Sequence, residues 1–229
     1  MSDAASDAIR REEIRIWDVP IRLFHWSLAL LLGLAWWTGE ERLMEWHRLT
    51  GYAILSLIAW RLVWGFCGSS TARFRDFVKG PKAVLAYLGA RGDTRYAAVP
   101  GHNPAGGWSV LVMLGLLAAQ VVLGLFSVDI DGLESGPLSY LVDFDTGRTM
   151  ALWHARIFTA LQVAVAAHVL AIAYYLFWRR QNLTAAMITG RRAWPGKERP
   201  DVRFVPAWRG VVWFAIVVAL LLVALEVAG

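Results

Sequence analysis

Residues 150–178, MALWHARIFTALQVAVAAHVLAIAYYLFW, form the longest apolar stretch of the chain and decide the fold class. A transmembrane helix needs about 20 mainly apolar residues (range about 17–25) to cross about 30 Å of hydrocarbon. This stretch is long enough to cross, and it contains two histidines, His154 and His168. Four further stretches meet the same requirement, namely residues 22–38, 46–66, 108–128 and 208–227. The sequence therefore predicts an all-α integral membrane protein with five spanning helices.

The overall composition agrees with a membrane protein. Of the 229 residues, 57% are hydrophobic and 18% are charged, and 13 are tryptophan, whereas soluble domains are about 45–50% apolar and about 25% charged. The single cysteine, Cys67, excludes an intramolecular disulfide, a cysteine-based zinc site and a haem attached through Cys-x-x-Cys-His. No small-residue cleavage pattern follows the first apolar run, so we expect a retained helix rather than a signal peptide.

The loops between the predicted spans alternate in charge. Residues 1–22, 67–107 and 179–209 hold four, six and eight Lys or Arg, whereas residues 39–45 and 127–149 hold one each. By the positive-inside rule, the N-terminus is cytoplasmic, and five crossings put the C-terminus outside. The net charge of +5 then reflects topology and attraction to anionic lipid, and no nucleic-acid partner is expected. The acidic 127–149 loop is either plain solvated surface or a docking site for a basic partner.

Four of the five histidines fall within predicted spans. A lone histidine near a span end is commonly an interfacial polar residue, but four ionisable groups at membrane depth need a common explanation. His154 and His168, 14 residues apart, point the same way to within about 40° and lie about 21 Å apart along one helix. A low-spin b-type haem needs two axial ligands from opposite sides of the porphyrin, and imidazole nitrogen is suited to iron. The topology pairs His25 with His168 on the cytoplasmic side and His47 with His154 on the outer side.

Several neighbouring residues are candidates for haem contacts. Arg61 also follows His47 by 14 residues, so a haem propionate would neutralise it; the alternative is an arginine that snorkels to the cytoplasmic interface. Gly51, one turn after His47, would leave room for the porphyrin face. The remaining candidates are arginines next to the histidines: Arg22, Arg48 and Arg156.

Polar residues elsewhere give weaker signals. Gln120, in the third predicted span, forms either a hydrogen bond between helices or a contact with a haem edge. His102 falls in a cytoplasmic loop and we expect no ligand role for it. Quinone chemistry needs a proton acceptor beside a haem; Asp18, His102 and Tyr52 are candidates, but their spacing singles out none of them.

A set of short motifs accompanies the histidines. They are IWDVPIRLFHW at 16–26, WHRLTGY at 46–52, RLVWG at 61–65, GHNPAGGW at 101–108 and MITG at 187–190. With these motifs the chain resembles, over about residues 15–192, the bacterial di-haem cytochrome b family, which includes the membrane subunit of nickel-iron hydrogenases and, more distantly, that of formate dehydrogenase. The resemblance implies a four-helix core with two non-covalent b-type haems, whose ligands match His25, His47, His154 and His168.

These observations predict an architecture and a leading function. We expect a cytoplasmic segment over residues 1–21, a di-haem four-helix domain over 22–192, and a linker with a fifth spanning helix over 193–229. The leading function is electron transfer between a quinone pool and a redox partner such as a hydrogenase or a c-type cytochrome, without enzymatic activity of the chain alone. The sequence leaves assembly into a homo-oligomer open.

Two other functions compete with electron transfer. One is a stand-alone oxidase that reduces quinone with electrons from a small substrate such as superoxide. The other is a histidine-lined metal transporter, although the spans contain almost no acidic residues to neutralise an ion. Activity of the purified chain would distinguish the first, and metal flux without a haem spectrum would distinguish the second.

Overall fold

The computed structural model describes residues 13–90, 99–130, 134–194 and 198–228. The first part of the expected cytoplasmic segment, Asp131 of the acidic loop and Lys197 of the linker lie outside these residues. Five long helices dominate the fold, and each is long and apolar enough to cross a membrane. They are α1 (Val19–Glu40), α2 (Met44–Cys67), α5 (Pro104–Phe126), α6 (Phe144–Phe177) and α8 (Ala207–Ala228). The predicted all-α membrane bundle with five spans is confirmed.

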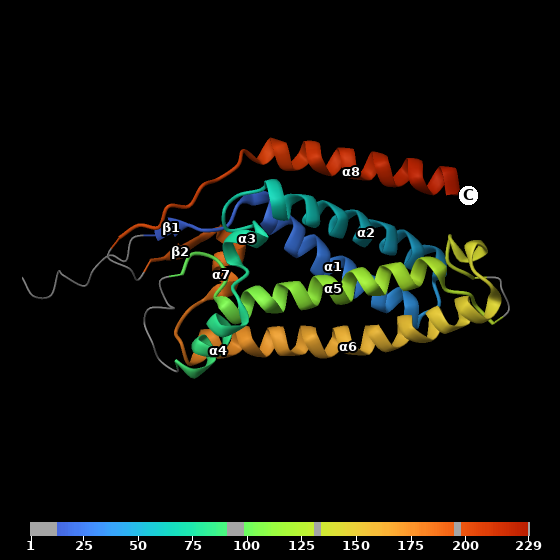
Figure 1. Cartoon of the computed structure of the whole chain (residues 1–229), viewed down its shortest axis with the longest axis horizontal. Helices are drawn as coiled ribbons and strands as arrows, with labels where there is room; N and C mark the ends of the chain where they lie inside the picture. Colours follow the sequence, from blue (N-terminus) through green and yellow to red (C-terminus); the bar gives the residue numbers. More distant parts are fainter. Residues whose placement is uncertain (1–12, 91–98, 131–133, 195–197, 229) are drawn as a thin grey trace, which may run out of the picture.

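The spanning helices run side by side along the long axis (Figure 1). α1 packs along α2, α5 packs along α6, and α2 also contacts α5. α6 makes close backbone contacts with α5 and with the short helix α7 (Leu183–Thr189), but none comparable with α1 or α2. The two helix pairs therefore meet closely through α2 and α5, and α6 stands apart from α1 and α2.

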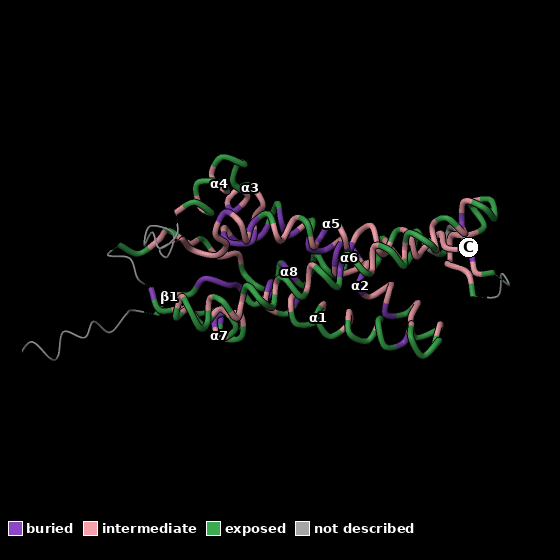
Figure 2. Tube along the Cα trace, turned by 90° about the horizontal axis from the view of Figure 1, so that it is seen from below, coloured by how far each residue is buried: buried purple, intermediate pink, exposed green. Residues whose placement is uncertain are grey.

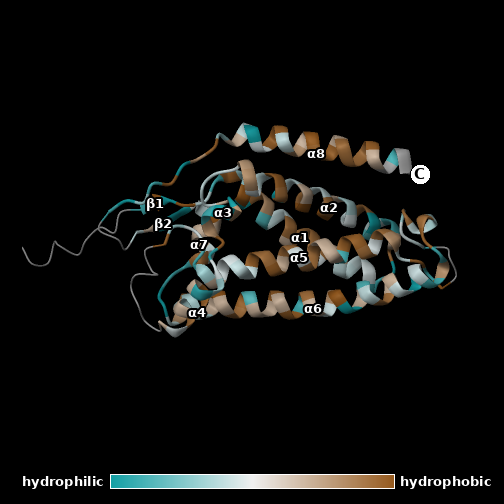
Figure 3. Ribbon diagram, in the orientation of Figure 1, coloured by the Kyte–Doolittle hydropathy of each residue, from teal (hydrophilic) through white to brown (hydrophobic). Residues whose placement is uncertain are grey.

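Apolar side chains cover the outside of the bundle. Hydrophobic residues predominate on the spanning helices (Figure 3), and many residues of these helices are exposed (Figure 2). Hydrocarbon solvates such side chains, so this surface suits lipid. The buried core is correspondingly small. Halfway along the bundle it consists of four residues, Ile54, Ile58, Leu117 and Leu161.

Side-chain caps define where three of the spanning helices begin. Asp18 accepts a hydrogen bond from the Ile21 amide (2.8 Å) before α1, and Asn103 and Asp143 cap α5 and α6 in the same way. Such caps satisfy amide groups that have no partner inside the helix. Because the capping residues are polar, a hydropathy pattern overlooks them, and these helices begin three to six residues before the predicted spans.

Short elements gather at one end of the bundle (Figure 1). They are the strands β1 (Glu13–Arg15) and β2 (Arg191–Ala193), which pair antiparallel, and the helices α3 (Phe74–Phe77), α4 (Pro81–Gly89) and α7. The described parts of the three basic segments, 1–22, 67–107 and 179–209, lie at this end. At the opposite end lies a 3-10 turn, η2 (Ser139–Leu141), within the acidic loop.

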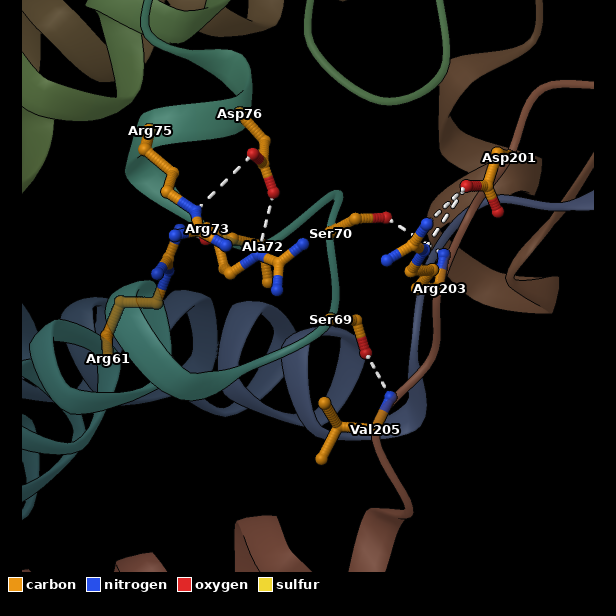
Figure 4. A network of polar contacts seen from close by, with 10 residues as sticks. All are labelled: Arg61, Ser69, Ser70, Ala72, Arg73, Arg75, Asp76, Asp201, Arg203 and Val205. Atoms are coloured by element: carbon orange, nitrogen blue, oxygen red, sulfur yellow. Dashed lines mark hydrogen bonds and ion pairs between the residues drawn. The ribbon is translucent and has the colours of Figure 1, made fainter.

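The fifth spanning helix packs against its own chain. α8 lies along α2 and also contacts α1, and the Trp60 indole donates to the Gly210 carbonyl (2.9 Å). The linker before α8 is held by the turn after α2, because the Ser70 amide donates to the Arg203 carbonyl (3.0 Å) and the Arg203 amide donates to the Ser70 hydroxyl (3.1 Å; Figure 4). α8 is therefore an outer helix on the α2 side, away from α6.

Candidate haem sites

The inner histidine pair lies toward the end that carries the strands. His25 comes from α1 and His168 from α6, and their ring centres are 6.3 Å apart. Both rings line a cavity of about 490 Å³, the inner cavity. The Nδ1 atom of His25 is buried and has no hydrogen-bond partner among the described residues.

The outer histidine pair lies at the opposite end. His47 of α2 and His154 of α6 have ring centres 6.1 Å apart, and both line a cavity of about 360 Å³, the outer cavity. The Nδ1 atom of His47 lies 2.9 Å from the Ala35 carbonyl oxygen, and that of His154 lies 2.8 Å from the Gln120 carbonyl oxygen. A carbonyl only accepts, so both Nδ1 atoms donate, and each Nε2 atom keeps the lone pair that a metal needs.

Both pairs have the ring-centre separation that two imidazoles on one metal ion would have. A metal–nitrogen bond of about 2 Å, with about 1.1 Å from the nitrogen to the ring centre on each side, puts the two centres about 6.2 Å apart. The observed separations, 6.3 and 6.1 Å, agree with this value. The cavities, about 490 and 360 Å³, fall within the range of about 300–1,000 Å³ usual for cofactor sites. Each cavity therefore has a histidine pair at the spacing that a haem iron would need, between α6 and the α1–α2 pair.

Glycines line the outer cavity, and two of them lie close to the histidine rings. A Cβ atom at Gly124 would lie 3.0 Å from the Cε1 atom of His154, and one at Gly39 would lie 3.3 Å from that of His47. Gly51, the predicted porphyrin contact, also lines the cavity, and a Cβ atom there would meet nothing within 4 Å. The close approaches of Gly39 and Gly124 escaped sequence reasoning, because they depend on contacts between helices.

Gln120 contacts both nitrogens of His154. Its main-chain carbonyl accepts from Nδ1, and its side-chain nitrogen lies 3.1 Å from Nε2. Its side-chain oxygen is buried without a hydrogen-bond partner among the described residues. Of the two predicted roles, the structure shows the hydrogen bond between helices. The Gln120 amide must turn aside when the Nε2 atom of His154 binds a metal.

The predicted arginines occupy different surroundings. Arg48 lines the outer cavity, whereas the other three line neither of these two cavities. Arg22 donates to the carbonyls of α7, with 3.3 Å between its Nε atom and the Met187 oxygen, and Arg156 lies over the Trp153 ring. Arg61 is 3% exposed, so it does not snorkel to the interface.

His102 is enclosed, although sequence analysis assigned it only to a loop. Its ring centre lies 4.8 Å from that of Trp17 and 4.8 Å from that of Phe77. The ring also lines the inner cavity, and its Nδ1 atom is buried without a hydrogen-bond partner among the described residues. Burial above all, and the nearby charges of Arg61 and the inner histidines, lower the pKa of His102 to about 3. His102 is therefore neutral at physiological pH.

Further polar groups lie in the wall of the inner cavity. The Tyr175 hydroxyl contacts the Tyr87 hydroxyl and accepts a hydrogen bond from the Asn103 side-chain amide (2.7 Å), and all three residues line the cavity. Of the other quinone candidates, Tyr52 lines the outer cavity. Asp18 is buried, with its oxygens bonded to the Ile21 amide and to the Trp64 indole.

Comparison with known proteins gives one match. The family model described as prokaryotic cytochrome b561 matches residues 16–190, about three quarters of the chain. The matched region runs from α1 to α7, contains both histidine pairs and ends before α8. No curated protein and no solved structure matches the chain.

Proposed function

Because the chain belongs to the prokaryotic cytochrome b561 family, we propose that it carries electrons across a bacterial inner membrane on two b-type haems, between a quinone pool and a redox partner protein. As a member of this family, the chain is a multi-pass membrane protein that binds haem b and transfers electrons. The number of haems and the reaction partners are our inference. It rests above all on the two histidine pairs, 6.3 and 6.1 Å apart, in separate cavities.

The placement of the pairs on α6 supports a route for electrons through the membrane. Haem iron, when bound, supplies a reversible one-electron change. His154 and His168 hold the two sites about 21 Å apart along one helix. Between them lies the apolar core of Ile54, Ile58, Leu117 and Leu161. These side chains exclude water, so electrons can cross while ions are held back.

The distribution of charge supports the orientation of the chain. The end with β1, β2, α4 and α7 carries the basic loops, so we place it and the inner cavity on the cytoplasmic side. The acidic loop with η2 and the end of α8 then lie in the periplasm. We further propose that residues 22–192 form the haem-binding unit and that the linker and α8, within 193–229, are an addition to it.

The polar groups of the inner cavity support quinone exchange at the cytoplasmic side. Tyr87, Asn103 and Tyr175 supply hydroxyl and amide groups, which suit the carbonyl and hydroxyl groups of a quinone and its quinol. We therefore place the quinone at the inner site. The redox partner would then exchange electrons at the outer site, near the acidic loop.

A haem count tests this proposal. We would purify the chain in detergent from cells supplied with haem, record its reduced-minus-oxidised spectrum and count haems as pyridine haemochromes. Two b-type haems per chain are expected, and His47→Ala should remove the outer one alone. One haem would mean that a pair is misassigned. No haem in a folded chain would contradict the proposal.

The same preparation distinguishes the two competing functions. Superoxide-dependent quinone reduction by the chain alone, with sustained turnover, would show an oxidase that needs no partner protein. A metal transporter would show flux without a haem spectrum. Among the described residues, no three or more His, Cys, Asp or Glu side chains gather into a metal-binding group, so the structure offers the transporter no support.

A further inference from the structure

The short helix α4 has an exposed face made of apolar side chains. Leu85 and Leu88 are 70% and 56% exposed, and their spacing of three positions puts them on the same side of a helix. Tyr87 lies on the other side, half-buried against the bundle. The nine residues of α4 extend over about 14 Å, so this helix is too short to cross the membrane. Exposure of large apolar side chains to water is unfavourable, so the surroundings of this face need an explanation.

Contacts at both ends hold α4 level with the ends of two spanning helices. Just before α4 begins, the Lys79 carbonyl accepts a hydrogen bond from the indole of Trp108 (2.8 Å), which lies in the second turn of α5. Near the end of α4, the Tyr87 hydroxyl contacts the hydroxyl of Tyr175, which lies in the last turn of α6. α4 therefore lies beside the ends of α5 and α6 and not beyond them (Figure 1). At this depth a membrane passes from hydrocarbon to headgroups.

Aromatic and basic side chains around α4 suit this depth. Trp108 and Trp178, at the nearby ends of α5 and α6, are exposed, and tryptophan is enriched where a membrane meets water. Lys79 and Lys82, at the start of α4, are also exposed, and neither forms an ion pair with a described residue. Their ammonium groups can therefore bind phosphate groups outside the chain, next to the apolar face of the same helix.

We propose that α4 lies in the membrane interface, with Leu85 and Leu88 among the acyl chains of the leaflet at this end and with Lys79 and Lys82 bound to the phosphates of anionic lipid. An interfacial helix buries its apolar face at the boundary between headgroups and acyl chains. Lysines next to the hydrocarbon attract anionic headgroups. Tyr87 and Leu88 also line the inner cavity, so α4 forms part of the wall between that cavity and the lipid.

A spin label on the full chain tests the position of this face in vesicles of phosphatidylcholine and phosphatidylglycerol. The chain has one cysteine, Cys67, which is exposed, so Cys67→Ser gives a background in which Leu85→Cys carries the only label. We expect this label to be more accessible to oxygen, which concentrates in hydrocarbon, than to a water-soluble nickel chelate. Val163→Cys, at an exposed position near the middle of α6, and Asp201→Cys, at an exposed position in the linker before α8, are the lipid and water references.

Two results would overturn this position of α4. If the nickel chelate reaches the label of Leu85→Cys as readily as that of Asp201→Cys, the face lies in water. If neither oxygen nor the chelate reaches the label, protein covers the face, as in an assembly of two copies of the chain. Leu88→Cys repeats the measurement at a second position, and circular dichroism shows that each labelled chain keeps its helices.

Quenching of a fluorophore attached through Leu85→Cys tests the class of lipid. Phosphatidylglycerol with a nitroxide on its acyl chain should quench the fluorophore more than the matching phosphatidylcholine. This preference should fall about fivefold for each of Lys79→Gln and Lys82→Gln. It should not change in Arg203→Gln, an exposed control at the same end. Equal quenching by the two lipids, or an unchanged preference in both lysine variants, would refute the binding of anionic lipid. These measurements need neither haem nor quinone, so their outcome is separate from that of the proposed electron transfer.

Discussion

The close contact between Gly124 and His154 leads to a sharp prediction about the outer haem. In Gly124→Ala, the added Cβ atom would lie 3.0 Å from Cε1 and 3.2 Å from Nδ1 of His154, closer than ordinary van der Waals contact, so the ring must move by a few tenths of an ångström. The 2.8 Å hydrogen bond from His154 to the Gln120 carbonyl opposes this movement. Loss of such a supporting bond typically weakens metal affinity by about 10–100-fold.

Release of haem to excess apomyoglobin measures this effect at each site. We expect Gly124→Ala to speed the release of haem from the outer site by about 10–100-fold. The rate of release from the inner site should not change. Gly115→Ala, on the same helix, is the matched control, since its Cβ atom would meet nothing within 4 Å. Replacement of Gly by Ala inside a helix stabilises the helix by about 0.8–1 kcal/mol, and this gain is the same in both variants. Equal release from the two variants would refute the reasoning, and acceleration of both phases would point to a general loss of structure.

Three further substitutions test contacts elsewhere in the bundle. Gln120→Leu should tighten outer haem binding by roughly twofold to tenfold, because it removes a hydrogen bond to His154 that competes with iron; weaker binding in the haem-release assay would contradict this. Asp143→Ala should lower the melting temperature more than Asp145→Ala, because only Asp143 caps α6. The Thr146 hydroxyl and amide lower the pKa of Asp143. The stabilisation of the protein by the ionised Asp143 side chain should therefore be lost as pH falls through that lowered pKa. The melting temperature of Asp143→Asn should lack this loss at low pH. Gly210→Leu should separate α8 from α1, because even a Cβ atom there would lie 2.9 Å from the Pro20 ring; we expect a lower melting temperature with an unchanged haem spectrum, and an unaltered melting temperature would show that α8 contributes little.

The sequence predicts the spans, and it predicts that the histidines of each pair lie close together, for simple physical reasons. Hydrocarbon requires long apolar helices, and the 14-residue spacing of His154 and His168 follows helical periodicity. The structure brings His25 to His168 and His47 to His154 as this reasoning expected. The spans depend on the composition of single helices, and the pairing depends on the order in which the helices cross the membrane. Both can be read from the sequence.

Contacts between distant segments were beyond sequence reasoning. His102 is enclosed because Trp17 and Phe77, from two other segments, meet around it. Arg61 is buried because the segment after α2 folds back, so that the Phe74 ring and the Ala72 carbonyl cover it. In both cases the local pattern is that of an ordinary loop or interface residue. The caps of α1, α5 and α6 could have been read from the Asp and Asn residues that precede those helices.

The position of α6 in the chain also bears on biogenesis. α6 carries one histidine of each pair, whereas α1 and α2 supply the other two. Chains are made from the N-terminus. α1, α2 and α5 therefore enter the membrane before His154 and His168 have been made, so that neither His25 nor His47 yet has its partner histidine. The arrival of α6 then completes both sites in one step, with α7 and α8 still to come. If these pairs hold haem as proposed, haem loading is tied to a late stage of synthesis, because a nascent chain that stops before α6 offers iron only single histidines.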